Sequence, residues 1–288
     1  MIKNARTQQP GHWYRIREIK KNLFEVHEPE HVSFYILKYG NKAVLIDSGL
    51  GLDHKEANKL FNALGIKEFS VMNTHLHCDH VGLNYKAKKV FAYKKEWAKY
   101  SKNKENKHTS IYYELLKDML PWPKKFWFKP QHKKFKPTHF IKLNKHYVFG
   151  PWRLKPIFVP GHTAGSLAFL EENSNVLLLG DFFYNGILYI NLEDSSIIQF
   201  EKSLDKIAKL YQSKRKKPQL LPCHNDIPLD GRYIKRLEVL LTRIKTGKQK
   251  ARGRWPFGRF FLPSRIFVYR DVRILIRVDH LKKWRKIT

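Results

Sequence analysis

The sequence predicts a mixed α/β fold, because short apolar strands alternate with amphipathic helices along most of the chain. Residues 32–37 and 43–46 are expected strands, separated by a turn at residues 39–41. An amphipathic helix is expected at residues 53–64. In addition, a carboxylate or a histidine follows several of the strands directly, which is typical of enzymes whose site lies at one edge of a sheet.

The other expected elements continue this alternation. Strand and helix periods can be read from period-two alternation and from 3.6-residue spacing of apolar residues, respectively. The expected strands are 13–26 (one or two strands, with a turn near 20–22), 66–72 as the end of a strand, 152–159, 167–170 with 176–179 as a hairpin, and 219–221. The expected helices are 86–100, a segment of helix formers, and then 111–120, 201–211 and 233–244.

Two segments stand apart from this pattern. Residues 101–140 are irregular and mix lysine with aromatic residues, so they form either a lid over a site or a loop that packs its own aromatic side chains. Residues 248–288 concentrate arginine, and residues 265–278 alternate as a hairpin turning at Arg270-Asp271. We therefore expect a catalytic domain over 1–247 and a basic, aromatic extension over 248–288, whose hairpin covers the core or binds phosphate groups.

The composition narrows the class of protein. A hydrophobic fraction of 42% and an aromatic fraction of 14% support a packed core and argue against disorder. The formal net charge of +31 favours an acidic partner: an anionic small molecule, a nucleic acid or a membrane surface contacted peripherally. With two cysteines, no apolar leader and no apolar run long enough to span a bilayer, we expect a cytoplasmic protein without a disulfide framework.

The segment 73–82 carries the clearest chemical signal. It holds His75, His77, Asp79 and His80 in the order His-x-His-x-Asp-His, between an apolar strand and a segment of helix formers. Neutral imidazole and carboxylate are the ligands that zinc prefers. Burying four such groups without partners costs several kcal/mol, so a purely structural role is hard to support. The segment therefore predicts a metal site.

Further candidates follow other apolar strands. Asp47 ends the strand at 43–46, His162 lies among small residues in 160–166, Asp181 follows 176–180, and His224 follows 219–222. Asp47 is either a local cap or a group that orients a metal ligand, and the second interpretation is favoured. Together with the His-rich segment, these residues supply enough ligands for two metal ions.

These motifs resemble the metallo-β-lactamase-fold hydrolases, whose five motifs occur here in order over roughly residues 13–245. The resemblance implies a four-layer αβ/βα sandwich with two Zn²⁺ ions, or alternatively Mn²⁺ or Fe²⁺, at the edge between the sheets. It implies that one ion is held by His75, His77 and His162, that the other is held by Asp79, His80 and His224, that Asp181 bridges them, and that Asp47 orients a ligand.

The same resemblance implies a hydrolytic reaction. A hydroxide shared by the two metals attacks a thioester or ester carbonyl, and Asp79 relays a proton to the leaving group. The nearest resemblance is to the metallo-β-lactamase-domain acyl-CoA thioesterases, through Trp13-Tyr14, Ile46 to Leu52 and the pattern from Gly180 to Gly186. Acyl-CoA thioester hydrolysis is therefore the expected function, with an anionic acyl compound as the substrate.

Alternative activities stay open. Tyr184 matches a tyrosine of homoserine lactonases, which favours a lactonase or another small-ester hydrolase; its other interpretation is a core tyrosine. The segment after Asp181 lacks the glutathione pattern of glyoxalase II. A nuclease of the same fold would suit the charge, although the chain lacks the expected RNA-binding elements. Cys78 and Cys223 are interpreted as side chains that fill space beside the metals.

Overall fold

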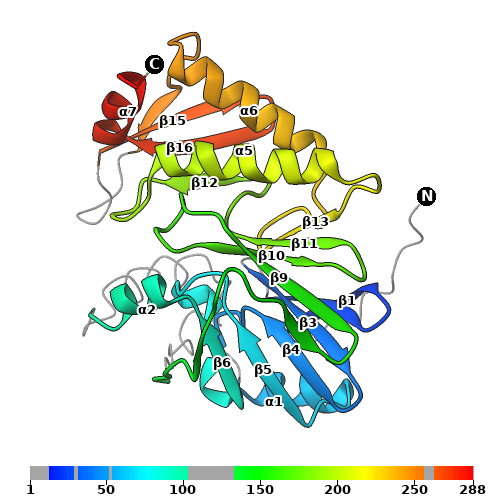
Figure 1. Cartoon of the computed structure of the whole chain (residues 1–288). Helices are drawn as coiled ribbons and strands as arrows, with labels where there is room; N and C mark the ends of the chain where they lie inside the picture. The colour runs from blue at the N-terminus through cyan, green and yellow to red at the C-terminus, as the bar shows by residue number, and fades with distance from the viewer. Residues whose placement is uncertain (1–12, 29–31, 52–53, 103–132, 256–262, 288) are drawn as a thin grey trace. The chain divides into compact units, whose positions relative to one another are not determined.

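The computed structural model describes residues 13–28, 32–51, 54–102, 133–255 and 263–287 (Figure 1). The chain folds as two compact units. The first consists of Met1–Lys142 and Tyr147–Arg153, and the second of Leu143–His146 and Leu154–Thr288. The helix expected at 111–120 lies outside the described residues, as does most of the irregular segment 101–140. The predicted division at residue 247 stays a prediction.

The first unit is built on a seven-stranded sheet in the order β1-β2-β3-β4-β5-β6-β7. The first four strands pair antiparallel, and β4 to β7 pair parallel. The elements of this unit are β1 (Arg15–Lys20), β2 (Leu23–His27), β3 (Ser33–Tyr39), β4 (Lys42–Ile46), α1 (His54–Ala63), β5 (Glu68–Met72), the 3₁₀ turns η1 (Cys78–His80) and η2 (Asn84–Lys86), β6 (Lys89–Ala92), α2 (Lys94–Tyr100), β7 (His139–Phe140) and β8 (Tyr147–Phe149).

Helix α1 packs its apolar face against this sheet (Figure 1). Ala57, Leu60 and Phe61 are buried at the 3.6-residue spacing that the sequence predicts, and they meet Phe34 and Val71 of the strands. The prediction of a helix over residues 86–100 was partly wrong, because only its second half is helical. β6 forms first, because its buried side chains pair parallel with β5, and α2 begins only at Lys94.

The second unit contains two sheets. One has the order β13-β11-β10-β9, and the other has the order β12-β16-β15-β14. The elements are β9 (Trp152–Phe158), in which the chain passes from the first unit to the second, β10 (Leu167–Glu171), β11 (Val176–Gly180), β12 (Ile187–Ile190), α5 (Ile197–Ser213), β13 (Gln219–Pro222), α6 (Arg232–Lys245), β14 (Gly253–Trp255), β15 (Ser264–Tyr269), β16 (Val272–Arg277) and α7 (Val278–Arg285).

The C-terminal hairpin is confirmed, and it belongs to the core of this unit. β15 and β16 pair antiparallel with Tyr269 opposite Val272, so the turn lies at residues 270–271 as predicted. β16 also pairs parallel with β12, a strand that the sequence pattern did not reveal. Trp284 of α7 is 1% exposed, and its Nε1 donates to Glu201 of α5 at 2.8 Å. Figure 1 shows α5 and α6 covering this sheet.

Within the described ranges, no helix combines the length and the apolarity that crossing a bilayer requires.

Candidate metal centre

In the first unit, two parallel strands deliver the candidate residues to the same edge of the sheet. Ile46 of β4 pairs with Met72 of β5, so Asp47 and the segment that begins at Asn73 leave the sheet side by side. The amide of Asp47 donates to the carbonyl of Met72 at 3.1 Å, which holds the two strand ends together. The adjacent ends of parallel strands thus bring together residues that are almost thirty positions apart.

Asp47 accepts hydrogen bonds that position the His-rich segment. Its Oδ1 accepts from the Thr74 amide at 2.8 Å, and its Oδ2 accepts from Thr74 Oγ1 at 2.7 Å. His80 Nδ1 lies 2.9 Å from the same Oδ2, and both side chains are fully buried. A carboxylate can only accept, so Nδ1 of His80 carries the proton and Nε2 keeps its lone pair for a metal.

The ligand atoms of this unit lie at metal-binding separations. Two ligand atoms on one tetrahedral zinc ion are about 3.3 Å apart, given Zn–N bonds of about 2.05 Å. His75 Nε2 lies 3.0 Å from His77 Nδ1, and His80 Nε2 lies 3.5 Å from Asp79 Oδ2. These are the two pairs that the resemblance assigns to different ions, so the donor set fits the expected metals.

The second unit supplies a matching set around one carboxylate. Asp181 follows β11, and His224 follows β13; these strands pair parallel, with Gly180 opposite Pro222. His224 Nε2 lies 3.0 Å from Asp181 Oδ1, and His162 Nε2 lies 3.5 Å from Asp181 Oδ2. Each oxygen of Asp181 therefore faces a different histidine, an arrangement that suits a carboxylate shared by two metal ions.

Backbone groups fix the orientation of His162. Its Nδ1 lies 2.9 Å from the carbonyl oxygen of Tyr189, which can only accept, so Nδ1 donates and Nε2 is left for a metal. Ser195 Oγ donates to the carbonyl oxygen of His162 at 2.7 Å, and the amide of Ser196 donates to the carbonyl oxygen of Gly161 at 2.8 Å. The strand β12 and the loop after it thus hold the segment that carries His162.

The other residues singled out from the sequence have structural neighbours. Tyr184 donates its hydroxyl to the carbonyl oxygen of Ile187 at 2.8 Å, and its ring centroid lies 4.9 Å from that of His224. Both cysteines are buried. Burial, together with the neighbouring Asp79, raises the pKa of the Cys78 thiol well above its usual value.

Sequence reasoning missed two buried carboxylates near the metal-binding segment. Glu96 of α2 accepts from the amide of Leu76, between His75 and His77, at 3.3 Å. Glu96 is the single acidic residue in the lysine-rich segment 86–100, and that isolation is a signal that could have drawn attention to it. Glu28 contacts the loop after Asp47, and no local pattern distinguishes it.

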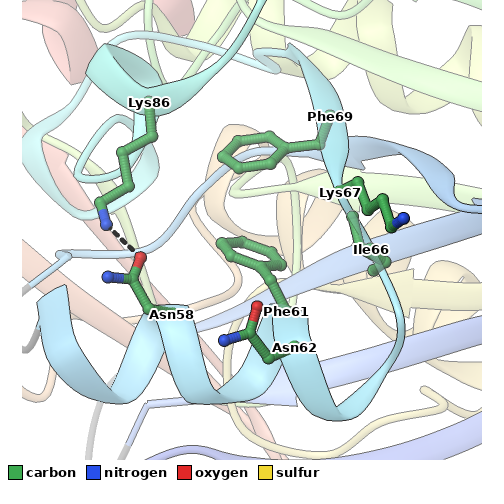
Figure 2. Close-up of a pocket in the computed structure, with 7 residues that line it drawn as sticks. All are labelled: Asn58, Phe61, Asn62, Ile66, Lys67, Phe69 and Lys86. Atoms are coloured by element: carbon green, nitrogen blue, oxygen red, sulfur yellow. Dashed lines mark hydrogen bonds between the residues drawn. The ribbon is translucent and has the colours of Figure 1, made fainter.

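A surface cavity of about 410 Å³ in the first unit lies apart from these ligands (Figure 2). Its aromatic base is formed by Phe61 and Phe69, whose rings stack with centroids 4.6 Å apart. Lys86 Nζ donates to Asn58 Oδ1 at its rim. The cavity is lined by Asn58, Phe61, Asn62, Ile66, Lys67, Phe69 and Lys86. None of these is a histidine, a cysteine or a carboxylate, so the metal chemistry is not located there.

Comparison with known proteins agrees with the motifs. Residues 27–214 match the family model described as "Metallo-beta-lactamase superfamily". The chain belongs to this superfamily. The prediction of a metal-dependent hydrolase with the α/β metallo-β-lactamase fold is therefore confirmed.

Several members of the metallo-β-lactamase superfamily resemble this chain. A probable metallo-hydrolase, MJ0888 of Methanocaldococcus jannaschii, is 28% identical over 191 residues, which cover 65% of this chain and 85% of the relative. The human acyl-coenzyme A thioesterase MBLAC2 is 23% identical over 216 residues, covering 69% and 76%. The crystal structure of the metallo-β-lactamase family protein TTHA1429 from Thermus thermophilus matches with a TM-score of 0.59 at 20% identity, covering 80% and 82%, and supports the fold alone.

Proposed function

We propose that this metallo-β-lactamase-superfamily hydrolase cleaves acyl-CoA thioesters with two zinc ions. The observation that carries the proposal is the placement of four ligand pairs, two in each unit, at the separations that a shared metal ion requires. His75, His77 and His162 would hold one ion, and Asp79, His80 and His224 the other. Asp181 would be shared by the two ions.

The residues around the ligands have defined tasks in this proposal. When bound, two divalent ions acidify water to supply a nucleophile at neutral pH and polarise the substrate carbonyl as Lewis acids. Asp47 holds Nδ1 of His80, and the Tyr189 carbonyl holds Nδ1 of His162, so that Nε2 of each is available. Asp79 would pass a proton to the departing thiolate, so that water and thioester become a carboxylic acid and free CoA.

The choice of a thioester rests on two supports. One is the similarity to an acyl-coenzyme A thioesterase at 23% identity, together with the motif from Ile46 to Leu52 that such proteins share. The other is the net charge of +31, which suits the phosphates of coenzyme A. The geometry of Tyr184 offers less support for a lactonase, because its hydroxyl already donates to the carbonyl oxygen of Ile187 at the start of β12.

The test measures metal content and thiol release on the same preparation. We expect two zinc ions per chain and the release of free CoA thiol from acyl-CoAs of some chain lengths. Changing a group that supports a metal ligand typically costs up to about 100-fold in activity. Asp181 is itself a proposed ligand, so Asp181→Asn should lower kcat/KM by at least about 100-fold. The matched control Asp205→Asn alters an exposed carboxylate of α5 and should change nothing.

Three results would contradict the proposal. Protein purified without metal and inert after zinc addition would remove the metal-dependent reaction. Zinc-loaded protein that is silent on every acyl-CoA but opens lactones would replace the thioesterase with the lactonase. Cleavage of RNA, with the steep salt dependence expected of phosphate contacts, would replace it with the nuclease.

A further inference from the structure

Glu28 is a fully buried carboxyl group that the proposed reaction does not use. It follows β2 and is 0% exposed. Its oxygens accept hydrogen bonds from the amides of Leu50 and Gly51, the second at 3.2 Å, and from Trp13 Nε1 at 3.4 Å. Glutamate is almost never fully buried unless it is paired. These donors therefore indicate that the carboxyl group has a specific role at this place.

The two amides belong to a loop whose shape needs glycine. Gly49 and Gly51 have φ angles of +63° and +64°, in the left-handed region. A Cβ on Gly49 would lie 2.5 Å from Oε2 of Glu28, so the carboxyl group fills the space that a side chain would occupy. The loop over residues 49–51 and Glu28 are therefore fitted to one another.

The other side of this loop touches the metal-binding segment. The amide of Gly82 donates to the carbonyl oxygen of Gly49 at 2.7 Å. A Cβ on Gly51 would lie 2.5 Å from the carbonyl oxygen of Gly82, so the two backbones are in direct contact. The amide of Ser48 also donates to the carbonyl oxygen of His80 at 3.0 Å. Movement of this loop would therefore displace the backbone of His80.

We propose that Glu28 is a positioning residue of the metal centre, whose carboxyl group fixes the loop 49–51 against Gly82 and thereby sets the place of His80. The proposal rests on the proposed function in taking His80 as a metal ligand. It assigns Glu28 a role in the affinity for one of the two ions, the one held by Asp79, His80 and His224. The chain of contacts lies entirely within the first unit.

The environment of Glu28 also makes the contact sensitive to pH. Burial raises its pKa from 4.5 to about 7, against the opposing effect of the hydrogen bonds from Leu50 and Trp13. Tyr14 is the titratable group that faces it, and Gly49, Leu50 and Phe34 bring no charge. The folded protein thus binds a proton that the unfolded chain releases above pH 4.5. The stability gained from this proton is complete below about pH 4.5 and is lost as pH rises through about 7.

The test compares Glu28→Gln with Glu25→Gln. The first substitution keeps the shape of the side chain and removes its charge. The second alters Glu25, a buried carboxylate of β2, the strand that Glu28 follows. Glu25 pairs with Arg17 and does not touch the loop. For Glu28→Gln we expect the second zinc ion to bind about 10- to 100-fold more weakly in chelator competition, as for other groups that support metal ligands. Glu25→Gln should lower the urea midpoint but leave both zinc affinities unchanged.

A second measurement follows the urea midpoint of the metal-free protein between pH 4.5 and 8. The wild type should lose stability relative to Glu28→Gln as pH rises from 4.5 to about 7, and the loss should level off above that, where Glu28 is ionised in both the folded and the unfolded protein. If Glu28→Gln does not fold, Trp13→Phe removes one donor to the same carboxyl group and should weaken the second zinc ion to a smaller degree.

Two outcomes would overturn the inference. If Glu28→Gln, or Trp13→Phe in its place, binds both ions as the wild type does, Glu28 only stabilises the fold, while the proposed function stands. If the wild type itself binds no zinc, the proposed function and the positioning role fail together.

Discussion

The substitution Asp47→Asn should weaken metal binding without altering the course of the backbone. Asp47 has a φ angle of +61°, in the left-handed region that asparagine tolerates as well as aspartate does. The new side chain therefore keeps the shape and the backbone conformation of the old one. What changes is the charge and the replacement of one accepting oxygen by an NH₂ group that donates.

The hydrogen bonds of Asp47 indicate the size of the effect. The remaining oxygen of asparagine can still accept from the Thr74 amide, at the position now 2.8 Å away. The amide nitrogen would then face His80 Nδ1, so His80 must move its proton to Nε2, the atom needed for the metal. Hydrogen bonds to charged groups contribute about 1.5–3 kcal/mol. We therefore expect stability to fall by about 2 kcal/mol and zinc affinity by about 10- to 100-fold.

Chelator competition at about pH 7.5, where unperturbed histidines are mostly neutral, measures the zinc affinity, and urea unfolding of the metal-free protein measures the stability. Asp205→Asn serves as the control, because that carboxylate is exposed and its partner Lys209 lies on the same helix. A variant that unfolds more readily but binds zinc with wild-type affinity would show that Asp47 acts on stability alone. The argument that it sets the tautomer of His80 would then be wrong.

Two further predictions test the surroundings of the site. Tyr184→Phe removes the hydrogen bond to Ile187 and should lower stability by about 1 kcal/mol in urea unfolding, with thioester turnover unchanged; a selective loss of lactone turnover would favour the lactonase. Gly82→Ala places a Cβ 2.0 Å from the carbonyl carbon of Leu50. The free energy of unfolding should therefore fall by at least about 3 kcal/mol, the upper end of the range for overpacking. A Cβ on Gly40 would have nothing within 4 Å, so Gly40→Ala should lower the free energy of unfolding by only about 1 kcal/mol, because of its positive φ. Equal losses for both variants would contradict the close contact between Gly82 and Leu50.

Most strands and helices could be predicted from local patterns, and two of the exceptions share a cause. β10 and β11 form the expected hairpin, and α5 and α6 cover the expected helical ranges, because each has a periodic apolar face. β12 and β6 were missed. Each has four residues, and each becomes a strand by pairing parallel with another strand, β5 for β6 and the distant β16 for β12. A local pattern carries no information about such a partner.

The sequence by itself determined the chemistry of the site. The order of histidines and aspartates, and their positions directly after apolar strands, were enough to predict the family and the ligand types, because these depend on residue identity and spacing.

Only the tertiary structure decided how those ligands are held. It placed Asp47 against His80 Nδ1, the Tyr189 carbonyl against His162 Nδ1, and the carboxyl group of Glu28 beneath the loop 49–51. Each of these contacts joins residues more than twenty positions apart, so it depends on how the strands pair rather than on any local pattern.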